Sequence, residues 1–133
     1  MNLKELARRG QEQEVKMSKQ FSNLEAWESA KKLSLFVYKL TDKFPQKEQF
    51  ALTSQITRAA VSIAANIAEG SSRSSKKDFC RFLEIAIGSA FELETLVDIA
   101  LDLDYVKSED KKQFDILVEK VLKLTFGLKR KLS

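Results

Sequence analysis

The side chains that can do chemistry in this sequence are few, and their types exclude several mechanisms. Histidine is absent and cysteine occurs once among 133 residues, so a Ser-His-Asp or Cys-His nucleophile, a His-ligated zinc and a disulfide framework are all excluded. Glu69, Glu92 and Glu94 can act as acid or base only if they are buried together. Because Glu92 and Glu94 point to different sides of a helix, they cannot pair. We therefore expect no catalytic residues, no metal site and no cofactor.

The cysteine, Cys80, lies next to Arg81 near the start of a predicted helix, a setting that can activate a thiol. No base or second cysteine accompanies it. Packing is therefore the favoured interpretation, and a reactive thiol is the alternative.

The best candidate for ligand contact is a basic, hydroxyl-rich stretch at the entrance of a predicted helix. Its residues are Arg73, Lys76, Lys77 and Arg81, beside Ser71, Ser72, Ser74 and Ser75. Cations, hydroxyls and free backbone N–H groups at a helix N-terminus favour phosphate. A solvated loop balanced by Asp78 and Glu69 explains the stretch equally well, because a net charge of +4 is modest for a nucleic-acid binder.

A second basic segment lies near the C-terminus, where cations can meet phosphate or simply complement the dipole of a helix end. The latter is the more ordinary interpretation. The candidate nucleic-acid-binding residues of the chain are Arg58, Arg73, Lys76, Lys77, Arg81, Lys129, Arg130 and Lys131. Asn66 and Glu69 lie about one helical turn apart and form a further polar pair. Glu69 can bridge to Arg73 or Arg58 and Asn66 can bond across the bundle, or the pair can bind a ligand.

Helices must position these residues, because the sequence has only four glycines and one proline, with 44% apolar and 32% charged side chains. Residues 1–20 are polar and predict a frayed helix or a disordered arm, and residues 21–133 predict a four-helix bundle. A capping box from Ser22 to Glu25 starts the first helix of the bundle, which ends at Pro45. The second runs over 47–69 with Gly70 as a left-handed cap, and the third over 75–103. The fourth is capped by Ser108.

Each helix has an apolar row at helical spacing, which predicts the core. The rows are Ala26, Ala30, Leu33, Val37, Leu40 and Phe44; Leu52, Ile56, Ala59, Ile63 and Ile67; Phe79, Phe82, Leu83, Ala86, Ala90, Leu93, Val97 and Ala100; and Phe114, Leu117, Val118, Val121, Leu124, Thr125 and Leu128. Gly88 is interpreted as a close helix approach. Short connections make neighbouring helices antiparallel, which predicts an up-down-up-down bundle.

Several apolar residues fall outside these rows and have no place in the core of one subunit. They are Val61, Ala64, Ala65, Ala68, Phe91 and Ile99. Monomers rarely expose contiguous apolar patches of more than a few hundred Å². We therefore expect a homo-oligomer, formed by ring closure or by a two-fold axis. No secretory signal or membrane span is evident, and a lone thiol fits the cytoplasm.

Two strings in the second and third helices carry a family resemblance. They are Arg58-Ala59-Ala60-Val61-Ser62-Ile63 and Asn66-Ile67-Ala68-Glu69-Gly70, followed by Arg73, Phe79, Phe82-Leu83, Ala86, Gly88-Ser89 and Glu92-Leu93-Glu94. Leu24-Glu25-Ala26-Trp27 and Lys43-Phe44-Pro45 match as well. Over about residues 21–130 the chain resembles the bacterial four-helix-bundle proteins encoded in intervening sequences of 23S ribosomal RNA genes.

The resemblance implies a subunit that assembles as a ring, typically a pentamer. The chain also looks related to the accessory variability determinant proteins of diversity-generating retroelements, which implies binding to nucleic acid and to a reverse transcriptase. Neither likeness brings catalytic residues. The sequence departs from the pattern at Ala64, where a proline is usual, and at Asp104, where a glycine commonly precedes the aromatic residue.

Two hypotheses follow from the residues and the resemblance. The first is a non-enzymatic oligomeric bundle that binds structured RNA or DNA through its basic residues. The alternative is a protein scaffold that displays helix ends to a partner enzyme without binding nucleic acid.

Overall fold

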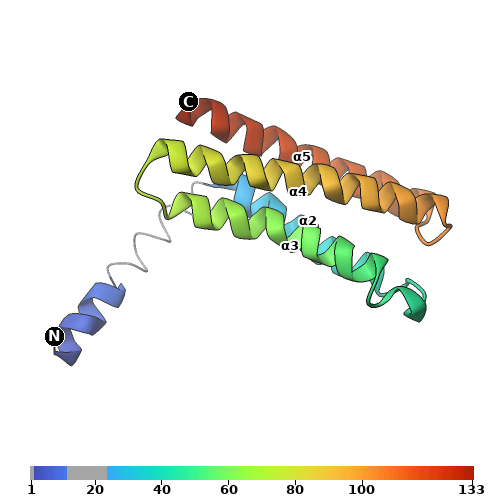
Figure 1. Ribbon diagram of the computed structural model, residues 1–133, viewed down its shortest axis with the longest axis horizontal. Helices are drawn as coiled ribbons and strands as arrows, with labels where there is room; N and C mark the ends of the chain where they lie inside the picture. The colour runs from blue at the N-terminus through green and yellow to red at the C-terminus, as the bar shows by residue number, and fades with distance from the viewer. Residues whose placement is uncertain (1, 12–23) are drawn as a thin grey trace.

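A computed structural model describes residues 2–11 and 24–133, and within them the chain is helical with no strand. Residues 3–11 form a short helix, and the rest of the predicted N-terminal arm after residue 11 lies outside the described residues. The elements that follow are α2 (Glu25–Thr41), the 3-10 helix η1 (Gln46–Glu48), α3 (Leu52–Ser71), α4 (Lys76–Asp102) and α5 (Ser108–Leu132). Figure 1 shows α2 to α5 packed lengthwise as a bundle.

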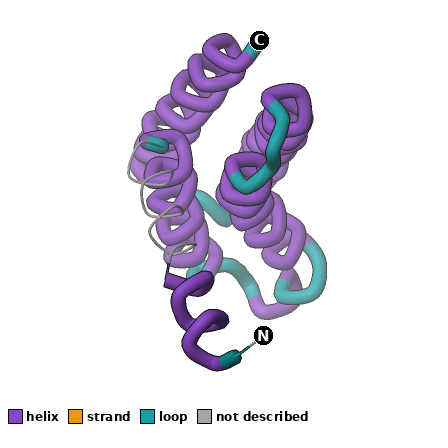
Figure 2. Tube along the Cα trace, turned by 90° about the vertical axis from the view of Figure 1, so that its left-hand side faces the viewer, coloured by secondary structure: helices purple, strands orange, loops and turns teal. Residues whose placement is uncertain are grey.

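Each of the four long helices packs against two others. α3 contacts α2 and α4, and α5 contacts α2 and α4. Figure 2 looks at the end of the bundle that carries the α3–α4 loop and the C-terminus, and shows the helices around a shared interior. A single core therefore lies between α2, α3, α4 and α5.

The predicted apolar rows are confirmed as the core. All six residues of the first predicted row are buried, although α2 ends at Thr41 and not at Pro45, so that Phe44 lies beyond the helix. Ile56, Ala59, Ile63 and Ile67 of the α3 row are buried as well. In α4 only Phe79 of the predicted row is partly exposed, and Phe114, Val118, Val121 and Thr125 of α5 are buried. Leu52, Phe79, Leu117, Leu124 and Leu128 are half-buried and pack against this core.

Three predicted helix starts are corrected. α2 begins at Glu25, where Leu24 makes no side-chain capping bond, and Ser22 lies outside the described residues. α5 begins at Ser108 itself, so Ser108 is the first helical residue and Lys107 the N-cap. α3 begins at Leu52 instead of residue 47, because the backbone after Pro45 takes three-residue turns and Ala51 leaves the helical region at φ −121° and ψ −105°. The predicted cap at Ser75 is confirmed, because its Oγ accepts a 3.1 Å bond from the Asp78 N–H.

The roles predicted for Gly70 and Gly88 are both wrong. Gly70 lies inside α3 without a positive φ, and a Cβ built there would lie 2.8 Å from Phe82 Cβ and 3.0 Å from Phe79 Cδ1. Gly88 is exposed, and a Cβ there would meet no atom within 4 Å. The close helix approach is therefore at Gly70, where α3 meets the first turns of α4.

The turn between α4 and α5 contains the only non-glycine residue with positive φ in the described part of the chain, Asp104 at 63°. The Tyr105 N–H donates to the Ala100 carbonyl and the Asp104 N–H to the Leu101 carbonyl. This bond pair is the Schellman motif, whose left-handed position is normally glycine. The Tyr105 hydroxyl then donates to Glu48 Oε2 at 2.9 Å and joins this turn to η1.

Among the described helices, none combines the length and the apolar character that a membrane crossing requires.

Candidate nucleic-acid interface

The structure brings the two basic segments of the sequence to one end of the bundle. Figure 1 shows the α3–α4 loop and the C-terminal end of α5 at the same end. Cys80 Sγ lies 3.9 Å from the Lys129 carbonyl oxygen, and Lys129 Nζ lies 3.3 Å from Glu84 Oε1. We call this region the basic end; its cations are Arg73, Lys76, Lys77, Arg81, Lys129, Arg130 and Lys131.

Three of these cations have carboxylate partners. Arg73 contacts Glu69 at 2.7 Å, Arg81 contacts Asp78 at 3.8 Å, and Lys129 contacts Glu84. In the described residues no ion pair involves the other four, which are Lys76, Lys77, Arg130 and Lys131. The basic end therefore keeps a surplus of positive charge.

An aromatic ring underlies the two arginines of the basic end. The guanidinium carbon of Arg73 lies 4.8 Å from the centroid of the Phe82 ring, and that of Arg81 lies 4.7 Å from it. Phe82 itself is 7% exposed. From the sequence, Phe82 belongs only to the core row, because the helical periodicity of α4 does not show that Arg73, in the preceding loop, folds back over it.

The serines of the loop are less available than predicted. Ser71 Oγ donates to the Ala68 carbonyl and Ser72 Oγ to the Glu69 carbonyl, each at 2.7 Å. Both hydroxyls close the end of α3, and Ser75 caps α4. These three serines serve the helix ends, which leaves the cations as the candidate phosphate contacts.

Arg58 is not part of the basic end. It lies in a polar groove of about 520 Å³ between α3 and α4, lined by Gln55, Arg58, Ala59, Ser62, Ser89 and Glu92. Among the lining residues, the Ser62 and Ser89 hydroxyls are 2.9 Å apart, and Asn66 Nδ2 donates to the Ser62 carbonyl at 2.8 Å. Asn66 therefore bonds within its own helix, whereas Glu69 makes the predicted bridge to Arg73.

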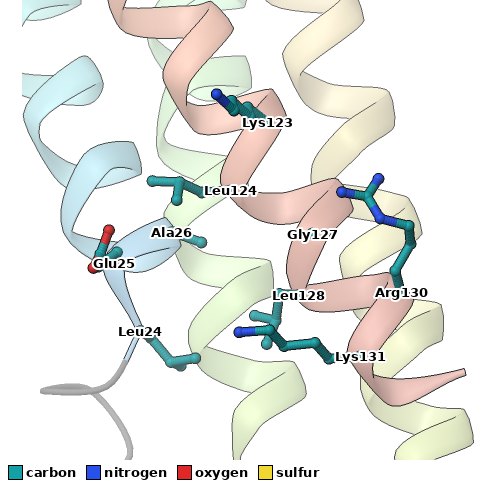
Figure 3. Close-up of a pocket in the computed structure, with 9 residues that line it drawn as sticks. All are labelled: Leu24, Glu25, Ala26, Lys123, Leu124, Gly127, Leu128, Arg130 and Lys131. Atoms are coloured by element: carbon teal, nitrogen blue, oxygen red, sulfur yellow. The ribbon is translucent and has the colours of Figure 1, made fainter.

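Two cavities flank the C-terminal part of α5. One of about 350 Å³ lies between α2 and α5 (Figure 3), with leucines inside and charged side chains at its rim. It is lined by Leu24, Glu25, Ala26, Lys123, Leu124, Gly127, Leu128, Arg130 and Lys131. The other, of about 550 Å³, lies between α4 and α5 and includes Lys77, Cys80 and Arg81. The half-buried Cys80 thiol lies between these two helices, with its Sγ 3.9 Å from the Lys129 carbonyl oxygen.

The three candidate acid–base residues are not brought together. Glu69 pairs with Arg73, Glu92 lines the α3–α4 groove, and Glu94 faces α5. Partial burial, followed by the neighbouring carboxylates of Asp115 and Asp98, raises the pKa of Glu94. Within the described chain, no group of three or more Cys, Asp or Glu side chains can hold a metal ion.

The residues predicted to lie outside the core are exposed to different extents. Val61 is 43%, Ile99 45% and Phe91 51% exposed, and Ala65 is also exposed. Ala64 and Ala68 are half-buried, and Ala64 packs against the core. Large apolar side chains that the sequence analysis missed are exposed as well, namely Leu35, Phe50, Ile85, Leu103, Ile116 and Phe126. Phe50 lies between η1 and α3, outside any helical row, and Leu103 is the C-cap of α4.

A helical bundle with a basic end and exposed apolar sides is the class of protein that these features define. The chain belongs to the family described as 23S rRNA-intervening sequence protein, which it matches over residues 22–127. A crystal structure of a protein with unknown function from the S23 ribosomal protein family of Bacteroides thetaiotaomicron has a TM-score of 0.73. It is 23% identical to this chain and covers 78% of it and 97% of its own length, so it supports the fold alone. The comparison with curated proteins gave no match.

Proposed function

We propose that this protein is a non-enzymatic helical-bundle protein that binds structured RNA, or DNA, through the phosphates that contact its basic end. The observation that carries the proposal is the meeting of two basic segments 49 residues apart in sequence, at the contact between Cys80 and Lys129. Two separate cationic helix ends are ordinary, but their union on one rigid surface is suited to a polyanion. The family name adds a connection to ribosomal RNA genes.

The proposal extends to assembly. The subunit is an antiparallel up-down-up-down bundle, which is supported by the contact of Gly70 with Phe82 and by the contact of Ser62 with Ser89 farther along both helices. Copies associate as a ring-like homo-oligomer, a pentamer by the resemblance, because Val61, Phe91 and Ile99 expose large apolar side chains. A ring repeats the basic end around one rim and multiplies the phosphate contacts.

The test is the salt dependence of binding to a fully paired RNA hairpin, measured by fluorescence anisotropy. Four unpaired cations predict a slope of log K against log salt of about −3 to −4, and hence roughly a hundredfold loss of affinity per subunit between about 50 and 200 mM salt. Replacing Lys76, Lys77, Arg130 and Lys131 by Gln removes those four contacts, so we expect the affinity and the magnitude of the slope to fall sharply.

The matched control removes four exposed lysines that lie elsewhere, Lys39, Lys107, Lys112 and Lys120, and lowers the net charge equally. We expect it to bind within about threefold of the wild type, because long-range charge is screened beyond about 10 Å at ordinary salt. Equal losses in both variants, or a slope near zero in the wild type, would reject the proposal.

A protein scaffold is the second candidate function, and the exposed apolar side chains favour it. Phe126 and Ile116 on α5, and Leu35 and Tyr38 on α2, are large and exposed. Such surfaces fit protein partners, among which the resemblance suggests a reverse transcriptase. Two results together would favour this second function. The protein would fail to bind RNA, and a protein partner would stay bound to it after nuclease treatment.

A further inference from the structure

The two arginines beside Phe82 are held in place from more than one direction. Their guanidinium carbons lie 4.8 and 4.7 Å from the ring centroid, which is the distance of a cation–π contact. Carboxylates hold them as well, because Glu69 contacts Arg73 and Asp78 contacts Arg81. Both guanidiniums therefore lie beside the same aromatic ring.

Their hydrogen-bonding edges are nevertheless open to solvent. The side chains of Arg73 and Arg81 are 41% and 61% exposed. A guanidinium carries five N–H donors in its plane, and stacking on a ring uses its face and leaves these donors available. Guanidiniums with open edges match the oxygens of a phosphate group, which arginine binds in a bidentate manner.

The position of Phe82 depends on Gly70. A Cβ at Gly70 would lie 2.8 Å from the Phe82 Cβ, so only glycine lets α3 approach the ring this closely. Glu69, Gly70, Arg73 and Phe82 are thus parts of one contact cluster, although they look like separate positions in the sequence. Because the Phe82 side chain is buried, its ring is held in place where both guanidiniums contact it.

We propose that Phe82 is the positioning residue of a two-arginine clamp, formed by Arg73 and Arg81, that binds one phosphate group of the nucleic-acid backbone. The inference rests on the proposed function and names the phosphate-binding point within the basic end. Bringing two like charges together is unfavourable without an anion between them, and the ring and the two carboxylates offset this cost in the free protein. Phosphate then binds to cations whose side chains are largely ordered beforehand.

The first experiment compares Phe82→Leu, Phe82→Tyr and Phe79→Leu in full-length chain, with the RNA hairpin as the probe. Leucine keeps an apolar side chain but removes the π face, so we expect Phe82→Leu to bind about fivefold more weakly and to lower the salt slope by about 1. Tyrosine keeps the ring, so Phe82→Tyr should bind within twofold of the wild type. Phe79 also contacts Gly70, and Phe79→Leu controls for a general disturbance of this packing. Circular dichroism confirms that each variant is folded.

Equal hairpin affinities of Phe82→Leu and Phe79→Leu overturn the clamp. A Phe82→Tyr protein that binds the hairpin as weakly as Phe82→Leu overturns it as well. If the wild type leaves the hairpin unbound, the proposed function fails, and the clamp is then judged by a titration with inorganic phosphate. In that titration the NMR signals of the Arg73 and Arg81 Nε–H groups should shift in the wild type and in Phe82→Tyr, and should need about fivefold more phosphate for the same shift in Phe82→Leu. Unshifted signals in the wild type overturn the clamp independently of any RNA.

Discussion

The helix contact at Gly70 leads to a sharp prediction about stability, which a second glycine controls. Substitution of Gly70 by Ala places a Cβ 2.8 Å from Phe82 Cβ, 3.0 Å from Phe79 Cδ1 and 3.3 Å from the Phe79 carbonyl oxygen. Phe82 Cβ and the carbonyl oxygen belong to rigid parts of α4, so the helices must move apart. Such overpacking costs about 1–3 kcal/mol.

The gain in helix propensity from Gly to Ala offsets about 1 kcal/mol of this cost. The net expectation for Gly70→Ala is therefore a loss of up to about 2 kcal/mol in the free energy of unfolding. Gly88→Ala has the same propensity gain without a clash, because no atom lies within 4 Å of its Cβ position. It should be more stable than the wild type by about 0.5–1 kcal/mol.

Urea denaturation followed by far-ultraviolet circular dichroism measures both variants at one protein concentration, because assembly also affects stability. The expected order of stability is Gly88→Ala, wild type, Gly70→Ala. A Gly70→Ala protein as stable as Gly88→Ala would refute the close approach of α3 to α4 and, with it, the platform proposed for the two arginines.

Three further predictions concern other parts of the molecule. Asp104→Gly should raise the free energy of unfolding by about 1 kcal/mol in thermal melts, because φ is 63° at this position and glycine adopts it without strain; an unchanged or lower Tm would contradict the Schellman turn. Phe91→Glu should reduce the assembled mass measured by light scattering, since the side chain is 51% exposed and apolar; a wild-type mass would remove Phe91 from the interface. Glu94→Gln should raise Tm at neutral pH and lose this advantage toward pH 4, because the pKa of Glu94 is raised in the folded state, mainly by burial, and its ionisation cost disappears as pH falls through that pKa. A constant difference in Tm from neutral to acid pH would show that the titration of Glu94 is not its cause.

The helical periodicity of the sequence predicts which side of each long helix is buried, and the agreement extends to single residues. Ala30, Leu33 and Val37 of α2, for instance, have no exposed surface. Such rows are predictable because a helix of 3.6 residues per turn sets which residues share a face, whatever the helix packs against. The ends of helices were predicted less well, as Ser108 shows, because several polar residues in a row can each serve as a cap.

The candidate site was only partly predictable. Both basic segments were recognised as possible phosphate contacts, but nothing in the sequence joins Arg81 to Lys129 or separates Arg58 from them. The register between α4 and α5 does join the first pair, through the contact of Cys80 with the Lys129 carbonyl. The register between α3 and α4 places Arg58 in the polar groove with Glu92.

By itself, the sequence determined the absence of histidine chemistry, the helical class of the protein, the composition of its core and its cationic segments, because all of these depend on residue types and short-range spacing. The tertiary structure alone decided that α3 approaches α4 closely at Gly70 and that no atom lies near the Cβ position of Gly88. It also decided that the guanidiniums of Arg73 and Arg81 both contact the Phe82 ring. The physical reason is that spacing along one helix orients side chains around that helix only. Which atoms of another helix they meet depends on how the two helices pack and on their register, and neither of these is written in a local pattern.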